Sequence, residues 1–224
     1  MSTWIGAVVE TRGRADLWAL MRRHGIKTDG VGAPPAFVLI EGTPALSALV
    51  PPAFSEALSR DAGGMVLGFF AQTNADVYEL QCFRGGECVR LLKYVRDDGG
   101  WIRHEGEVQP WERSFFFAGD PTAGADELPY LLDAEVSDVD RARYEAAKRS
   151  GDASTVFDLL RPSSTAVLQR LCGAFGVDPT APAGRWRPPR SARAWLIPGA
   201  VILFFVGMFL LGALTGGSPV PTSR

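Results

Sequence analysis

The sequence contains one long apolar stretch that restricts the fold more than any other feature. Residues 194–214, AWLIPGAVILFFVGMFLLGAL, form a run of 21 residues without a charged side chain. A helix of this length rises about 31 Å, which matches the hydrocarbon thickness of a bilayer. Helices of soluble proteins are rarely apolar on every face over such a length. The stretch therefore predicts a transmembrane helix embedded in the lipid bilayer.

The charges that flank this stretch predict its direction in the membrane. Four arginines lie within ten residues before it, whereas only Arg224 follows it. Basic residues are enriched on the cytoplasmic side of membrane segments. The first residues, MSTWIGAVVETRGR, also lack the basic start and long apolar core of a signal peptide. We therefore expect a tail-anchored, single-pass protein with a cytoplasmic N-terminal domain and a short non-cytoplasmic tail at 215–224, in the inner membrane if the source is bacterial.

Residues 179–193 have the composition of a juxtamembrane linker. Proline supplies four of the sixteen residues from Asp178 to Arg193, which favours an extended chain. Each arginine near an anionic leaflet contributes about 1 kcal/mol of attraction, and tryptophan favours the interfacial zone. A ligand for a PxxP-binding adaptor domain is the alternative for the RPPR sequence. The predicted membrane-interface residues are Arg185, Trp186, Arg187, Arg190, Arg193 and Trp195.

Residues 1–178 are expected to form one α+β domain, because 46% of the residues are apolar and 21% are charged. A meander of antiparallel strands is predicted over about 65–117, since runs rich in strand formers alternate there with glycine turns. Its last strand is expected at 111–117. The N-terminal part predicts strands at 4–10 and 37–40, separated by a helix that ends near His24. The C-terminal part predicts helices at 137–148, 154–160 and 163–176.

The chain lacks the sequence motifs of common enzyme classes. It contains no phosphate-binding loop, no nucleophile elbow and no HExxH zinc motif. The densest polar cluster is RHEGEVQPWE, in which Arg103, His104 and Glu105 are weak catalytic candidates. On a strand, however, His104 and Glu105 point to opposite faces, and Arg103 and Glu105 share a face with Trp101. A solvated face with an ion pair is therefore the competing interpretation.

Composition also limits the cofactors and partners. Cys82, Cys88 and Cys172 have no CxxC spacing, so we expect free thiols and neither a metal site nor a cofactor. Five of the 23 basic residues follow residue 184, which leaves 18 against 25 acidic residues in the preceding part. Such an acidic domain argues against binding to nucleic acid.

These features predict a tail-anchored membrane protein that presents a cytosolic binding or interaction domain to a protein partner of unknown identity. Removal of residues 185–224 is expected to release a soluble domain. Two alternatives remain open from the sequence. One is a membrane-attached enzyme with an unrecognised site near Arg103, His104 and Glu105, together with Arg90. The other is an accessory subunit of a membrane complex, with the apolar helix packed on its partners.

Overall fold

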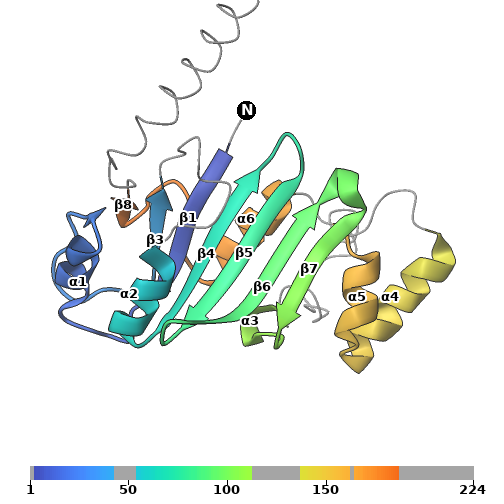
Figure 1. Ribbon diagram of the computed structural model, residues 1–224, viewed down its shortest axis with the longest axis horizontal. Coiled ribbons are helices and arrows are strands. Elements are labelled where there is room, and N and C mark those ends of the chain that lie inside the picture. The colour runs from blue at the N-terminus through green and yellow to red at the C-terminus, as the bar shows by residue number, and fades with distance from the viewer. Residues whose placement is uncertain (1–2, 43–53, 113–136, 162–163, 187–224) are drawn as a thin grey trace, which may run out of the picture. The chain divides into compact units, whose positions relative to one another are not determined.

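The computed structural model describes residues 3–42, 54–112, 137–161 and 164–186, which are drawn in colour in Figure 1. Contacts divide the chain into two units, Met1–Arg187 and Pro188–Arg224, and every described residue belongs to the first. Within the described residues, no helix has both the length and the apolar character needed to cross a membrane. The predicted transmembrane stretch at 194–214 lies outside the described residues.

The first unit is an α+β domain built on one mainly antiparallel sheet, as the sequence predicts (Figure 1). Its eight strands follow the order β2-β8-β3-β1-β4-β5-β6-β7. The pair β3–β8 is parallel and the other neighbours are antiparallel. The strands are β1 (Thr3–Glu10), β2 (Ile26–Lys27), β3 (Phe37–Gly42), β4 (Met65–Gln72), β5 (Val77–Arg84), β6 (Glu87–Val95), β7 (Gly100–Gly106) and β8 (Gly184–Trp186).

Strands β4 to β7 confirm the predicted meander of antiparallel strands as far as Gly106. Gly85 and Gly86 join β5 to β6 with φ angles of +58° and +88°, which L side chains rarely adopt. Beyond β7 the prediction fails, because Pro110–Glu112 forms the short helix α3 instead of the start of a strand. The carboxylate of Glu112 accepts a hydrogen bond from the amide of Gln109 and closes this turn. Residues 113–117 of the predicted strand lie outside the described residues.

Helices cover both faces of the sheet, so the central strands are apolar on both sides. Helices α1 (Leu17–Arg23) and α2 (Phe54–Ala62) pack on one face, and α4 (Asp138–Ser150), α5 (Ala153–Leu159) and α6 (Ser164–Ala174) contribute to the core on the other. We call the core beneath α1 and α2 the first core, and the core beneath α4, α5 and α6 the second core. In β3, Val38 and Ile40 belong to the first core, whereas Leu39 belongs to the second. This arrangement explains the continuous apolar run of β3 and confirms the strand predicted at 37–40.

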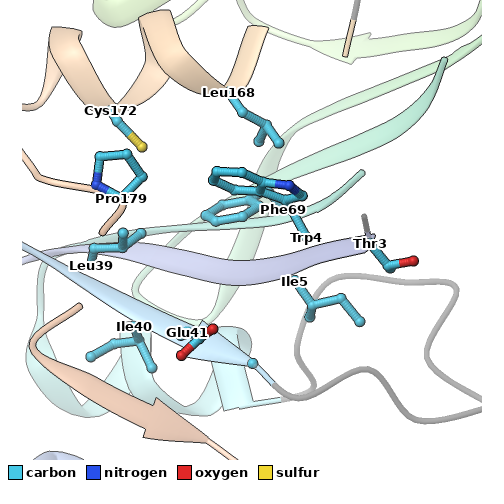
Figure 2. Close-up of a pocket in the computed structure, with 11 residues that line it drawn as sticks. Thr3, Trp4, Ile5, Leu39, Ile40, Glu41, Phe69, Leu168, Cys172 and Pro179 are labelled. Atoms are coloured by element: carbon cyan, nitrogen blue, oxygen red, sulfur yellow. The ribbon is translucent and has the colours of Figure 1, made fainter. Parts of the chain in front are cut away.

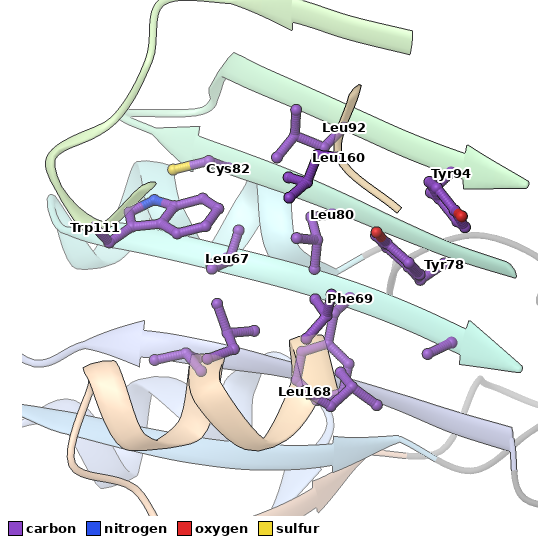
Figure 3. Close-up of a cluster of buried hydrophobic side chains, with 14 of the residues drawn as sticks. Leu67, Phe69, Tyr78, Leu80, Cys82, Leu92, Tyr94, Trp111, Leu160 and Leu168 are labelled. Atoms are coloured by element: carbon purple, nitrogen blue, oxygen red, sulfur yellow. The ribbon is translucent and has the colours of Figure 1, made fainter. Parts of the chain in front are cut away.

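The predicted helices near residues 137–176 are also present. Ser137 caps α4, because its hydroxyl accepts a hydrogen bond from the amide of Asp140. Asp152 caps α5 in the same way through the amide of Thr155. Figure 3 shows how Leu160 and Leu168 cover the second core, where they lie over Leu80 and Phe69 of the meander.

The structure corrects the predicted linker at 179–193, because Gly184–Trp186 forms β8 inside the sheet. A Cβ on Gly184 would lie 2.9 Å from Ile26 Cγ2, so glycine allows β2 and β8 to approach closely. Trp186 is 8% exposed and packs 5.3 Å from the ring of Phe54, so it is a core residue and not an interfacial one. Arg185 remains exposed and forms an ion pair with Glu41 at 2.8 Å.

The rest of the predicted membrane-interface set falls outside the part of the chain that the structure describes. Arg187, Arg190, Arg193 and Trp195 lie outside the described residues. The proline content predicted an extended backbone from residue 178 onward. An extended segment can pair with strands whose edges are unpaired, as β8 does between β2 and β3. The folded domain therefore continues beyond residue 178 to the end of β8.

The position of β8 changes the expected effect of truncation. A chain that ends after Arg187 should fold, whereas a chain that ends after Gly184 loses Trp186 and part of its strand pairing. Loss of a buried tryptophan costs about 3–5 kcal/mol. We expect a difference of that size between the two chains in the free energy of unfolding, measured by urea denaturation. Arg185→Ala in the longer chain is the matched control, and equal stability of the two truncated chains would refute the assignment of β8.

Candidate functional site

The three weak catalytic candidates of the sequence lie on β7 and do not converge. Arg103 and Glu105 share one face, with 3.7 Å between Arg103 Nε and Glu105 Oε1, and their side chains are 57% and 64% exposed. His104 points to the other face, where its ring stacks on Phe157 of α5 at 5.5 Å. The predicted separation of His104 from Glu105 is therefore confirmed. The Glu105 carboxylate therefore lies on the opposite face of β7 from His104 and does not form an acid–base pair with it.

Trp101 lies on a different face from the one expected. The pairing of β6 with β7 shifts between Lys93 and Tyr94, which leaves Ile102 as an extra residue in β7. This bulge turns Trp101 to the same side as His104, and the Trp101 ring lies 4.8 Å from Phe157. Trp101 therefore packs on the second core, away from Arg103 and Glu105.

The same polar region contains a buried ion pair between Arg90 of β6 and Glu112 of α3. Their side chains are 3% and 0% exposed. Arg90 Nε and Nη2 donate to the Glu112 carboxylate at 2.7–3.0 Å, which is a two-pronged geometry. Arg90 Nη1 donates to the carbonyl oxygens of His104 and Gly106 at 2.9 and 3.0 Å. The guanidinium also lies 5.2 Å from the centre of the Phe157 ring.

The environment of this pair favours a structural role. Burial raises the pKa of the Glu112 carboxyl above its usual value, and hydrogen bonds from Arg90 and the Gln109 amide act in the opposite direction. Both oxygens of Glu112 accept hydrogen bonds, and all three guanidinium nitrogens donate them. The two charges are thus occupied by each other and by the backbone, which joins the end of β7 to α3.

A cavity of about 290 Å³ provides a more open site beside β1, β3 and α6 (Figure 2). It lies between the first half of β1, the end of β3, Phe69 of β4 and helix α6. In Figure 2 the indole of Trp4 lies beside the ring of Phe69, and Leu168 approaches it from α6. The lining residues are Thr3, Trp4, Ile5, Leu39, Ile40, Glu41, Gly42, Phe69, Leu168, Cys172 and Pro179.

A glycine in β1 makes room for the aromatic part of this lining. A Cβ on Gly6 would lie 2.7 Å from Phe69 Cζ and 2.5 Å from the carbonyl oxygen of Ile40. Only glycine therefore lets the Phe69 ring lie across β1 beside Trp4. Cys172, from α6, is 3% exposed, and burial raises the pKa of its thiol. A thiol that stays protonated acts here as a small apolar group.

The register of the strands fixes the end of the sheet at which this cavity lies. Gly42 at the end of β3 is paired in parallel with Trp186 at the end of β8. Strand β1 is antiparallel to β3, with Gly6 opposite Glu41, so Thr3 at its start lies at the same end. The cavity therefore lies at the sheet end where the chain leaves β8, as Figure 1 also shows for β1, β3 and β8.

The sequence reasoning did not identify this cavity. The residues that line it come from β1, β3, β4 and the region from Leu168 to Pro179, and most of them are apolar residues that a sequence pattern assigns to the core. Among the residues that the structure describes, there is no group of three His, Cys, Asp or Glu side chains able to hold a metal ion. The three cysteines are free, with Cys82 and Cys172 buried and Cys88 exposed.

Comparison with known proteins does not assign the chain to a family. No family model matches it, and neither a curated protein nor a solved structure does. The functional assignment therefore depends on the residues and geometry described above.

The buried ion pair predicts a large and specific effect on stability. Arg90→Met leaves Glu112 buried without its partner, which should cost about 3–5 kcal/mol in the free energy of unfolding. The double variant Arg90→Met/Glu112→Leu removes both charges and should recover most of this loss. Arg103→Met, on the exposed face of the neighbouring strand, is the control and should change stability by less than about 0.5 kcal/mol. Urea denaturation measures all three, and equal effects of Arg90→Met and Arg103→Met would contradict the structural role.

Proposed function

We propose that this chain is a single-pass membrane protein that holds an α+β binding domain at the cytoplasmic surface of a membrane. The observation that carries the proposal is the uncharged stretch of 21 residues at 194–214, which begins eight residues after the last strand of the domain. A segment of this length and composition suits insertion in a bilayer, with lipid as its first partner.

The short connection between domain and membrane segment supports a tethering role. Seven residues, 187–193, separate Trp186 from Ala194. A fully extended chain of this length spans at most about 25 Å. A tether of this kind raises the effective concentration of the domain near other membrane components, so weak contacts become sufficient for binding.

Basic residues in this connection support the proposed orientation. Arg187, Arg190 and Arg193 precede the stretch, and no acidic residue follows Asp178. A basic flank favours the cytoplasmic side, where anionic headgroups attract each arginine by about 1 kcal/mol. The acidic composition of the preceding domain argues against nucleic acid as the partner.

The arrangement of polar residues favours a binding protein over an enzyme. His104, the histidine of the RHEGEVQPWE cluster, stacks on Phe157 and shares no face with Arg103 or Glu105. Arg90 and Glu112 are occupied in a buried ion pair. The cavity beside Trp4 is lined mainly by apolar groups, which suits recognition of a ligand better than acid–base chemistry.

Membrane insertion can be tested on the full chain by washing membranes with alkaline carbonate. We expect the protein to remain in the pellet. Arginine near the centre of a membrane helix costs about 2.5–3.5 kcal/mol per residue, so Leu203→Arg/Val206→Arg should move the protein to the supernatant. Leu203→Ala is the control and should stay in the pellet. Recovery of the unchanged protein in the supernatant would refute the proposal.

The orientation can be tested through the exposed thiol of Cys88 on β6. A membrane-impermeant maleimide should leave Cys88 unlabelled in intact bacterial spheroplasts and label it after the membrane is permeabilised. Cys88→Ser should remove this labelling and thereby assign it. Labelling of Cys88 in intact spheroplasts would place the domain on the opposite side of the membrane from the one proposed.

A further inference from the structure

We propose that the cavity between β1, β3 and α6 binds a hydrocarbon chain of a membrane phospholipid. This inference rests on the proposed function, because it requires the domain to be held at a bilayer. It names lipid as a ligand of the folded domain itself, in addition to the lipid that surrounds residues 194–214.

The chemistry of the lining selects an apolar ligand. Among the eleven lining residues only Glu41 is charged, and its carboxylate is paired with Arg185 at 2.8 Å. Most of the other lining residues carry aromatic, aliphatic or thiol side chains, and Figure 2 shows Trp4, Phe69 and Leu168 beside one another. A charged ligand would lose its hydration in this site without gaining a free partner, whereas a hydrocarbon chain loses nothing polar.

The size of the cavity selects part of a lipid and not a whole one. Its volume of about 290 Å³ lies at the lower end of the range of small-molecule pockets, about 300–1,000 Å³. That space accommodates a segment of a single chain, so the headgroup would remain outside.

The position of the cavity supplies the source of the ligand. It lies at the sheet end formed by the start of β1 and the ends of β3 and β8. The chain leaves the sheet at this end, and the seven residues 187–193 limit the distance to the proposed membrane segment to about 25 Å. A hydrocarbon chain that enters from the bilayer surface therefore has a short path to an apolar site.

Photo-crosslinking of the full chain in membranes tests this proposal and the proposed function separately. The protein is reconstituted in vesicles of phosphatidylethanolamine and phosphatidylglycerol that contain phosphatidylglycerol with a diazirine in one acyl chain. Trypsin then separates the informative regions, because residues 1–12 contain Trp4, residues 171–185 contain Cys172, and residues 194–224 contain the proposed membrane segment. We expect lipid adducts in all three peptides.

Two variants block the cavity in different ways. Cys172→Phe fills it from α6, and Thr3→Trp covers it from the partly exposed start of β1. Either variant should abolish adducts in residues 1–12 and 171–185 and leave those in residues 194–224 unchanged. Cys88→Phe introduces the same side chain at an exposed position of β6 and should preserve the full pattern. Urea denaturation of each variant verifies that the domain is folded.

The possible results separate the two proposals. Adducts in residues 194–224 alone would overturn lipid binding in the cavity and leave the membrane segment supported, which is also the result expected if another part of the chain occupies the cavity. An absence of adducts in all three peptides would overturn both proposals. Labelling of residues 1–12 and 171–185 by a free photoreactive fatty acid, but not by the phospholipid, would reassign the cavity to a soluble ligand and overturn the proposed source.

Discussion

The buried ion pair between Arg90 and Glu112 constrains the path of the chain after β7. A charge in an apolar core is tolerated only when an opposite charge and hydrogen bonds replace the water that it loses. Arg90 meets this requirement with the Glu112 carboxylate and with carbonyl oxygens at the end of β7. The chain that follows β7 must therefore turn back over the sheet, and the region that resembles a reactive polar cluster in sequence serves to hold this turn in place.

The part of the domain around β1 and β3 depends on close packing. Both strands are covered on their two faces, so their side chains alternate between two cores. Gly6 permits the Phe69 ring to lie across β1, and Gly184 permits β8 to enter beside β2. Close packing is incomplete at one end of these strands, where the cavity beside Trp4 lies. An apolar cavity at a sheet end is consistent with ligand binding, because filling it would add apolar contacts without burying a charge.

Periodicity in the sequence was sufficient to predict most of the sheet and its covering helices. Local sequence patterns predict strands such as β3 to β7, because each contains an apolar run or an alternation of apolar and polar residues and is bounded by turn residues. Arg90 shares its face with Leu92 and Tyr94, so its burial was also open to prediction from alternation. Features set by distant contacts were missed. Strand β8 has three residues and exists because they pair with β3 on one side and β2 on the other, and the bulge at Ile102 reverses the face of Trp101.

The presence of β8 also shortens the connection between the folded domain and the proposed membrane segment at 194–214. A proline-rich linker over residues 179–193 would have separated the domain from the membrane segment by an extended spacer of fifteen residues. With β8 paired on both sides, the chain between the last strand and residue 194 is reduced to seven residues. If residues 194–214 are inserted as proposed, a force on this segment acts directly on a strand whose Trp186 is part of the core.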